Sequence, residues 1–229
     1  GVAPLLETGH QLEALGAEVS FLLGGRSCAD IAQVAQFRQV GEVYITSEDG
    51  SVIEAGAVVT DVRQLTDVYI GASAHVVGAL RLEDVSLCSR PDAVSGVGDG
   101  VILEHVIVSE GSHIGDGAQL DNCFVGQGCH IGRMYSATQS LFFANCHFEN
   151  GEACAYFAGP YSVSHHKATL MIACMTSFFN AGSGSNQSNH SYKMGPNKYG
   201  QLQRGAKLGS SSYVYWPMQV GAFSTVIGH

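Results

Sequence analysis

A repeat of about six residues runs through most of this chain and limits the folds that it can adopt. Branched apolar residues recur every five or six positions, and a small residue often stands two places before each one. Neither the period of an amphipathic helix nor the alternation of a hairpin produces this spacing. It predicts one short strand and one corner per repeat, so that three repeats close one triangular coil. The series comprises Val97, Leu103, Val108, Ile114, Leu120, Val125, Ile131, Phe142, Phe148, Cys154, Pro160, His166, Ile172, Phe178, Leu208, Val214, Val220 and Val226.

The small residues of the repeat are expected inside the prism that these coils would form. Side chains alternate along a strand, so a residue two places before an inward apolar residue also points inward. It must be small because the corner of a narrow prism has little room. A count of 29 Gly against 5 Pro suits a chain that turns tightly and often. These small inward positions are Ser112, Ala118, Cys123, Cys129 and Cys146.

The hexapeptides that carry Ile114-Gly115 and Ile131-Gly132 resemble those of the hexapeptide-repeat acyltransferases, and the resemblance covers about residues 52–229. It implies an all-β fold, the left-handed parallel β-helix, and a homotrimer with sites between subunits. The segment from Ser164 to Gly221 also resembles an uncharacterised group of hexapeptide proteins that are labelled transferases. That label rests on analogy of fold, which by itself does not define a reaction.

Two segments depart from the repeat. Residues 1–50 lack it, and we expect a helix over Arg26–Val40 and a hairpin at Asp49-Gly50, as an N-terminal cap or the remnant of a preceding domain. Residues 51–229 are expected to form the β-helix. Within it, residues 179–205 break the period and are rich in Gly, Ser and Asn, which predicts a long inserted surface loop. Such loops on a rigid scaffold are often functional.

Composition argues against several classes of protein. The chain is 45% hydrophobic and 14% charged, which is typical of a globular protein. A net charge of −9 argues against nonspecific nucleic-acid binding. No apolar run is long enough to span a bilayer, and no signal peptide is recognised. The seven cysteines form no C-x-x-C pair and are expected to be reduced and buried, as in a cytoplasmic protein.

Charge is unevenly distributed along the chain. All 20 acidic residues lie at or before Glu152. This pattern predicts either a small anionic ligand, such as CoA or a nucleotide-sugar, or a surface that meets an acidic neighbour in an oligomer. The basic residues after Glu152 are Lys167, Lys193, Lys198, Arg204 and Lys207.

Coil stacking also predicts a column of histidines. The inward residues Ile114, Ile131, Phe148 and His166 follow one another at intervals of three repeats, so they should stack inside one face. The residue before each one should then point outward, on strands about 4.8 Å apart. The expected column is His113, His130, His147 and His165. If the insertion adds no net coil, Lys207 lies directly above His165.

The resemblance assigns roles to this region. In the acyltransferases a surface histidine removes a proton from the acceptor hydroxyl or amine, and acyl-CoA is the co-substrate; a neutral imidazole suits that step. His165 is therefore predicted as the general base, with His190 and His147 as the other catalytic candidates. Neither a metal site nor a tightly bound cofactor is predicted. The residues expected to contact CoA are Lys193, Lys198, Arg204, Lys207, Asn186 and Asn189.

Two other functions stay open at this point. Histidines on neighbouring coils could share a zinc ion, as in the γ-class carbonic anhydrases, although the closely spaced histidine pair that those enzymes use is not found here. Alternatively, the chain could be a non-catalytic trimerising or sugar-nucleotide-binding module of a nucleotidyltransferase-type protein. The repeat does not specify the acceptor substrate.

Overall fold

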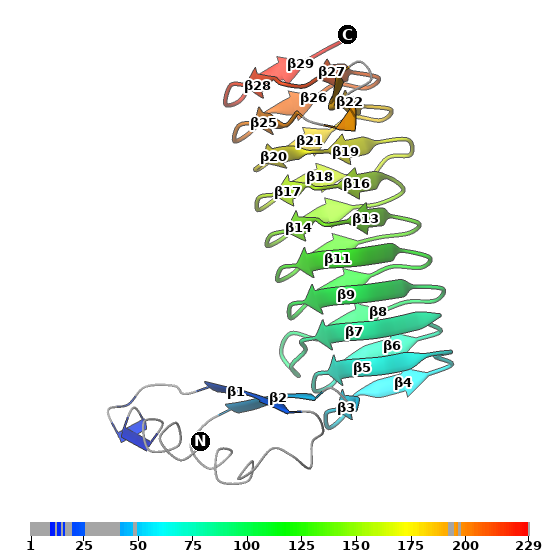
Figure 1. The fold of residues 1–229 in the computed structure, drawn as a ribbon, viewed down its shortest axis with the longest axis vertical. Coiled ribbons are helices and arrows are strands. Elements are labelled where there is room, and N and C mark those ends of the chain that lie inside the picture. The colour runs from blue at the N-terminus through cyan, green and yellow to red at the C-terminus, as the bar shows by residue number, and fades with distance from the viewer. Residues whose placement is uncertain are drawn as a thin grey trace.

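The chain forms a parallel β-helix from residue 50 onward (Figure 1). The computed structural model describes residues 10–11, 13–14, 16, 20–25, 42–47, 50–191, 195–196 and 198–228. Every named strand of the stacked coils pairs in parallel with the coil before or after it, and the ends of the stack are far apart. The predicted all-β fold class is confirmed.

Three flat faces surround the core, and the strands belong to them as follows. Face 1 contains β13 (Ser136–Thr138), β16 (Glu152–Cys154), β19 (Leu170–Ile172), β22 (Asn186–Ser188) and β27 (Tyr213–Tyr215). Face 2 contains β3 (Val52–Ile53), β14 (Leu141–Phe142), β17 (Phe157–Ala158), β20 (Cys174–Thr176), β25 (Gly200–Leu202) and β28 (Gln219–Val220). Four longer strands bend across faces 1 and 2: β5 (Leu65–Ile70), β7 (Arg81–Leu87), β9 (Ile102–Val108) and β11 (Gln119–Val125). Face 3 contains β4 (Val58–Thr60), β6 (His75–Val77), β8 (Gly96–Val97), β10 (His113–Ile114), β12 (His130–Ile131), β15 (His147–Phe148), β18 (Val163–Ser164), β21 (Asn180–Ala181), β26 (Lys207–Leu208) and β29 (Thr225–Val226).

The corner between faces 2 and 3 requires left-handed backbone. Gly128 and Asn145 have φ angles of 64° and 59°, a region that Gly adopts freely and Asn tolerates. Their N–H groups donate to the carbonyls of Glu110 and Gln127 on the preceding coil, at 3.1 and 2.9 Å. The corners are therefore hydrogen-bonded from coil to coil, which explains the need for Gly and Asn at these positions.

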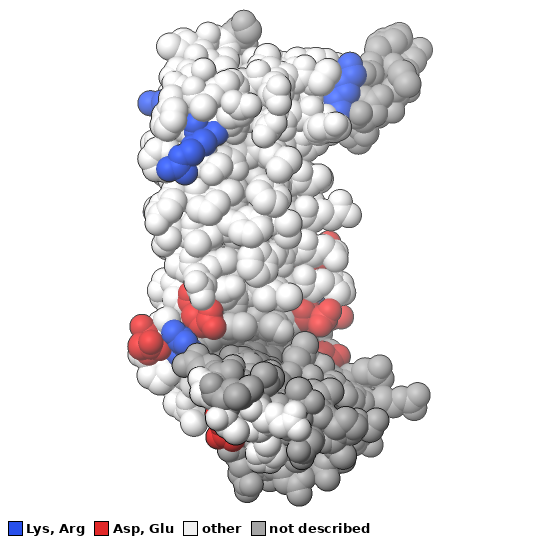
Figure 2. Space-filling model, turned by 90° about the vertical axis from the view of Figure 1, so that its left-hand side faces the viewer, with Lys and Arg blue, Asp and Glu red and all other residues white. Residues whose placement is uncertain are grey.

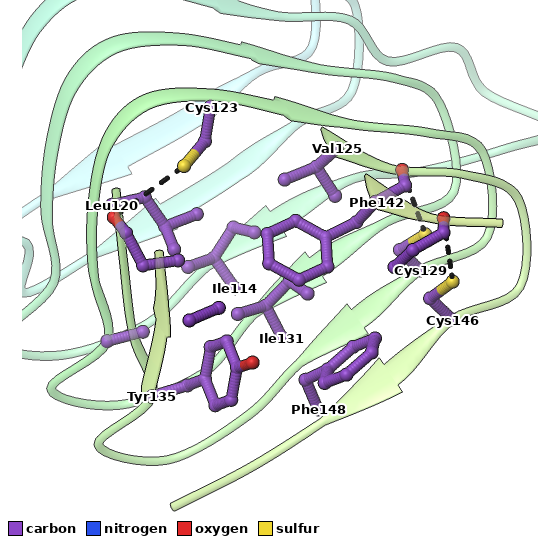
Figure 3. Close-up of a cluster of buried hydrophobic side chains, with 14 of the residues drawn as sticks. Ile114, Leu120, Cys123, Val125, Cys129, Ile131, Tyr135, Phe142, Cys146 and Phe148 are labelled. Atoms are coloured by element: carbon purple, nitrogen blue, oxygen red, sulfur yellow. Dashed lines mark hydrogen bonds between the residues drawn. The ribbon is translucent and has the colours of Figure 1, made fainter. Parts of the chain in front are cut away.

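The core consists of inward side chains stacked along the axis (Figure 3). The middle coils hold an aromatic cluster in which the ring of Phe148 lies 5.0 Å from that of Phe142 and 5.4 Å from that of Tyr135. Below them Ile114 and Ile131 stack on the same face as Phe148. The predicted small inward residues are all buried, which confirms their assignment: Ser112, Ala118, Cys123, Cys129 and Cys146. The described cysteines are all free thiols, as expected.

The repeat series is wrong between Cys154 and Phe178. The inward residues that follow Phe148 are Ala153 and then Ala158, so two successive steps are each one position shorter than the predicted six. Because side chains alternate along a strand, a slip of one position exchanges the inner and outer places. The residues predicted to point inward here are half-buried or exposed instead: Cys154, Pro160, His166, Ile172 and Phe178.

The inserted loop is shorter than predicted. Asn180 pairs with Val163 on the coil before and Lys207 on the coil after, so the helix continues past residue 179. The departure is confined to about residues 189–199, where β23 (His190–Ser191) and β24 (Gly195–Pro196) pair antiparallel. Gln187 is buried and its Oε1 accepts a hydrogen bond from the Ile172 N–H, so a polar residue occupies the expected apolar place. That substitution concealed the repeat in the sequence.

The predicted hairpin at Asp49-Gly50 falls partly outside the described residues. The described strand before it, β2 (Glu42–Ser47), pairs in parallel with β1 (Ser20–Gly25), and β3 after it pairs in parallel with β5. The helix predicted over Arg26–Val40 falls outside the described residues. In the described part of the chain, no helix has the length and apolar character needed to cross a membrane.

Candidate functional site

Three of the four predicted histidines form a column on face 3. The backbone of His113 pairs with that of His130, and His130 pairs with His147. The residue after each histidine is buried, so alternation places the imidazoles on the outer surface. His75 belongs to the same column through Gly96, but sequence analysis missed it because the coil from His75 to Gly96 is longer than three regular repeats.

The fourth histidine does not continue the column. The strand partner of His147 is Val163, and the partner of Phe148 is Ser164, which is fully buried. His165 and His166 follow this strand and are both exposed. The predictions that His165 stacks on His147 and that His166 is inward are therefore wrong. The cause is the slip after Phe148, where two successive steps are each one position shorter than predicted.

His165 nevertheless lies close to the column. Its ring centroid is 5.6 Å from that of His147 and 4.4 Å from that of His166. One step beyond the register of β15 and β18, His165 stands beside Glu149. The patch thus contains four histidines from three coils, namely His130, His147, His165 and His166.

Glu149 is the residue of this candidate site that sequence analysis missed. Its Oε1 lies 3.0 Å from Nε2 of His147 and 3.3 Å from Nε2 of His130. The two imidazole rings are edge to face, with centroids 4.7 Å apart. The only signal in the sequence is the spacing: Glu149 is the second residue after His147, which places both side chains on the outside of one strand.

Space for the Glu149 side chain comes from Gly132 on the preceding coil. A Cβ at Gly132 would overlap the carboxyl group of Glu149, with Oε1 only 2.8 Å away. The Gly of the hexapeptide therefore has a second use at this position, because it allows a carboxylate to lie flat over the coil below. His113 has a similar support, since its ring lies over Gly96.

The electrostatics of the cluster keep the carboxylate charged. The hydrogen bond from His147, followed by the nearby charges of His147, His130 and Arg133, holds the pKa of Glu149 below its usual value. Burial lowers the pKa of His130, and the charge of His147 lowers it further. The side chain of Glu149 is 19% exposed, and each of the two histidines is 45% exposed. The cluster is thus anchored at its base and open to solvent above.

The basic residues predicted to bind CoA do not converge on the histidines. Lys207 pairs with Asn180 and Thr225, so strands β18 and β21 separate it from His147; its predicted place directly above His165 is wrong. The Arg204 guanidinium lies 5.1 Å from the ring centroid of Phe178 at the corner of face 2.

Lys198 and Arg204 line two neighbouring grooves over face 2 that share Gln201. Tyr199 and Met218 line the groove of Lys198. The face shown in Figure 2 carries acidic side chains, with a basic one beside them, over the lower coils, basic ones over the upper coils and mainly uncharged ones between.

The remaining predicted ligands are dispersed. Asn186 is on face 1, where its backbone pairs with Tyr213. Asn189 is buried, and its Oδ1 has no hydrogen-bond partner among the described residues. The backbone of His190 lies in the short hairpin, and Lys193 falls outside the described residues.

Fold and site together define a parallel β-helix with a histidine–carboxylate cluster on one face. A sequence profile of the family described as "Domain of unknown function (DUF4954)" matches residues 12–229, and the chain belongs to this family. Over a short stretch it is also similar to the electron transfer subunit of dihydroorotate dehydrogenase B (NAD(+)) from Streptococcus thermophilus (strain ATCC BAA-491 / LMD-9). The identity is 41% over 51 residues, which are 22% of this chain. The chain spans 20% of the length of that curated relative.

Proposed function

We propose that the chain is a group-transfer enzyme of the hexapeptide-repeat type that moves an acyl group, most simply acetyl, from acyl-CoA to a hydroxyl or amine of a sugar or nucleotide-sugar. The observation that carries the proposal is the 3.0 Å contact between His147 Nε2 and Glu149 Oε1 on an open face of the fold. A parallel β-helix is compatible with this class of transferase, and a surface histidine oriented by a carboxylate is a general-base arrangement.

The proposed step uses the two nitrogens of His147 differently. Nε2–H donates to Glu149, which fixes the tautomer and leaves Nδ1 as the proton acceptor. Nδ1 removes the proton of the acceptor hydroxyl or amine while the acceptor atom bonds to the thioester carbonyl carbon. The tetrahedral intermediate then breaks its C–S bond, and the coenzyme thiolate takes the proton back from the imidazolium. Glu149 is a positioning residue in this scheme.

His165 remains a second candidate for the base. Its ring is exposed and lies 5.6 Å from that of His147, so one acceptor could reach either imidazole. Within the described part of the chain, the carboxylate of Glu149 contacts and orients the ring of His147, whereas no carboxylate contacts the ring of His165. We therefore rank His147 as the first candidate for the general base. Variants of both residues separate the two assignments.

The phosphates of the donor would bind away from the histidines. Lys207 is on the same face, three strands above His147, which corresponds to roughly 14 Å at the usual strand spacing. An extended coenzyme carries its thioester far from its phosphates, so this separation suits acyl-CoA. Lys198 and Arg204 on face 2 would contact the phosphates of a donor that is bound between neighbouring copies of a homotrimer. Sedimentation at several protein concentrations tests whether the chain forms that trimer.

The experiment is release of free CoA from acetyl-CoA, measured with a panel of amino sugars and nucleotide-sugars as acceptors. We expect His147→Ala to lower the rate by about 10²–10⁴-fold, the range typical of a lost general base. Glu149→Gln should lower it less, and His165→Ala least. The matched control is His105→Ala, because His105 also pairs with a carboxylate, Asp121, at 3.3 Å but away from face 3. Equal rates in the wild type and His147→Ala would refute the assignment of the base.

A further inference from the structure

The histidine–carboxylate cluster has the composition and geometry of a metal site. One ring nitrogen of His130, one ring nitrogen of His147 and an oxygen of Glu149 all lie within 4.8 Å of one another. A single oxygen, Oε1, approaches both imidazole nitrogens, at 3.3 and 3.0 Å. Three donor atoms that converge on one point from two neighbouring coils can bind one ion.

We propose that His130, His147 and Glu149 bind one Zn²⁺ ion, with water at the open fourth position. Two imidazole nitrogens and one carboxylate oxygen form a donor set that catalytic zinc sites use. Hard cations such as Mg²⁺ and Ca²⁺ prefer oxygen donors, so a set with two nitrogens discriminates against them.

The observed distances are close to those that zinc needs. Zinc binds nitrogen and oxygen at about 2.0–2.2 Å, so two donors in a tetrahedral site are roughly 3.4 Å apart. The contacts of Oε1 with the two nitrogens, 3.0 and 3.3 Å, are already near this value. Small rotations of two half-exposed imidazoles would complete the triangle, and both rings are anchored on paired strands.

The backbone supports this arrangement from below. Gly132 provides the space in which the Glu149 side chain lies. Phe148, which separates His147 from Glu149 in the sequence, is fully buried. His165 is the nearest further imidazole in the patch, with its ring 5.6 Å from that of His147. Because its ring lies farther from that of His147 than the ring of His130 does, His165 is not assigned as a ligand.

The inference concerns the side chains of the proposed transferase site but does not rest on acyl transfer. An Nε2 that binds zinc fixes the proton on Nδ1, so His147 cannot be the general base and a zinc ligand at the same moment. In the zinc-bound form, the metal would supply an activated water or polarise a carbonyl. Binding and transfer are therefore measured separately.

The test is titration of the tag-free, chelator-treated protein with Zn²⁺ by calorimetry, followed by Co²⁺ titration monitored by visible absorption. We expect one ion per chain and a tetrahedral cobalt spectrum. His147→Ala and Glu149→Gln should each weaken binding at least about tenfold, since loss of even an outer-shell partner costs roughly 10–100-fold. Gly132→Ala should weaken it similarly without removing a ligand, because the new Cβ displaces Glu149.

Two controls make the result decisive. His105→Ala removes a histidine that pairs with Asp121 elsewhere, and it should leave zinc affinity unchanged. The fluorescence of Trp216, the single tryptophan, reports whether each variant is folded. Binding that is absent in the wild type, or unchanged in His147→Ala, would overturn the proposal.

Activity assays separate this inference from the proposed function. Zinc binding by a protein that transfers no acyl group would support the metal site and count against the transferase. Acyl transfer by a metal-free protein that binds no zinc would support the transferase and count against the metal site.

Discussion

The aromatic cluster beneath the candidate site should carry much of the stability of the middle coils. Phe148 is fully buried, and its ring contacts those of Phe142, Tyr135 and Tyr156 at centroid distances of 5.0, 5.4 and 5.7 Å. Phe148→Ala removes the ring from a narrow prism whose walls are hydrogen-bonded from coil to coil. The walls cannot collapse to fill the space, so a cavity should remain.

The expected cost follows from the area that the ring buries. A buried aromatic side chain removes roughly 150–250 Å² from water, which at about 25 cal/mol per Å² is an upper bound of roughly 4–6 kcal/mol. Measured Phe→Ala changes in cores give about 3–5 kcal/mol, and we expect this range for Phe148→Ala. Phe148→Leu retains most of the volume and should cost less than about 1.5 kcal/mol.

The assay is urea unfolding followed by far-UV circular dichroism, with the slope checked for each variant before free energies are compared. The control is Phe223→Ala, which removes the same ring from a corner where it is 69% exposed, and should change stability by about 0.5 kcal/mol or less. If Phe148→Ala cost no more than Phe223→Ala, the cluster would not be the support that its geometry indicates.

Three further outcomes are expected from single positions. Gly115→Ala should destabilise the protein by more than about 1 kcal/mol in urea unfolding, because its Cβ would lie 3.0 Å from backbone atoms of Gly132; an unchanged midpoint would contradict this. Burial raises the pKa of the Cys123 thiol to about 11, so at pH 8 a thiol reagent should label it only after unfolding, and rapid labelling located by mass spectrometry would exclude this. Trp216→Phe should cost about 1–3 kcal/mol because the Ile172 carbonyl loses the 2.8 Å hydrogen bond from Nε1; a neutral effect would show that another donor replaces it.

The hexapeptide period predicted more of the fold than of the site. Equal steps of three repeats placed His113, His130 and His147 in one column, because identical coils must stack identical positions. The same steps located the small inward residues, which have no room to be larger. Local sequence sufficed for these features because they depend only on alternation and coil length.

The cluster itself could not be derived in this way. Glu149 meets His130 only because neighbouring coils are in register and Gly132 leaves room, and both conditions involve residues distant in sequence. His165 is displaced because two successive steps after Phe148 are each one position shorter than predicted, and neither the predicted nor the actual inward residues there are strongly apolar.

The sequence by itself therefore determined the coil, its period and the faces that histidines occupy in the regular part. Tertiary structure decided where the period slips, which polar residues continue the core, and which acidic group joins the histidines. The physical reason is that each apolar residue by itself favours burial, whereas the hydrogen-bond register depends on two neighbouring coils together. A shift of one position in that register exchanges the core and the surface.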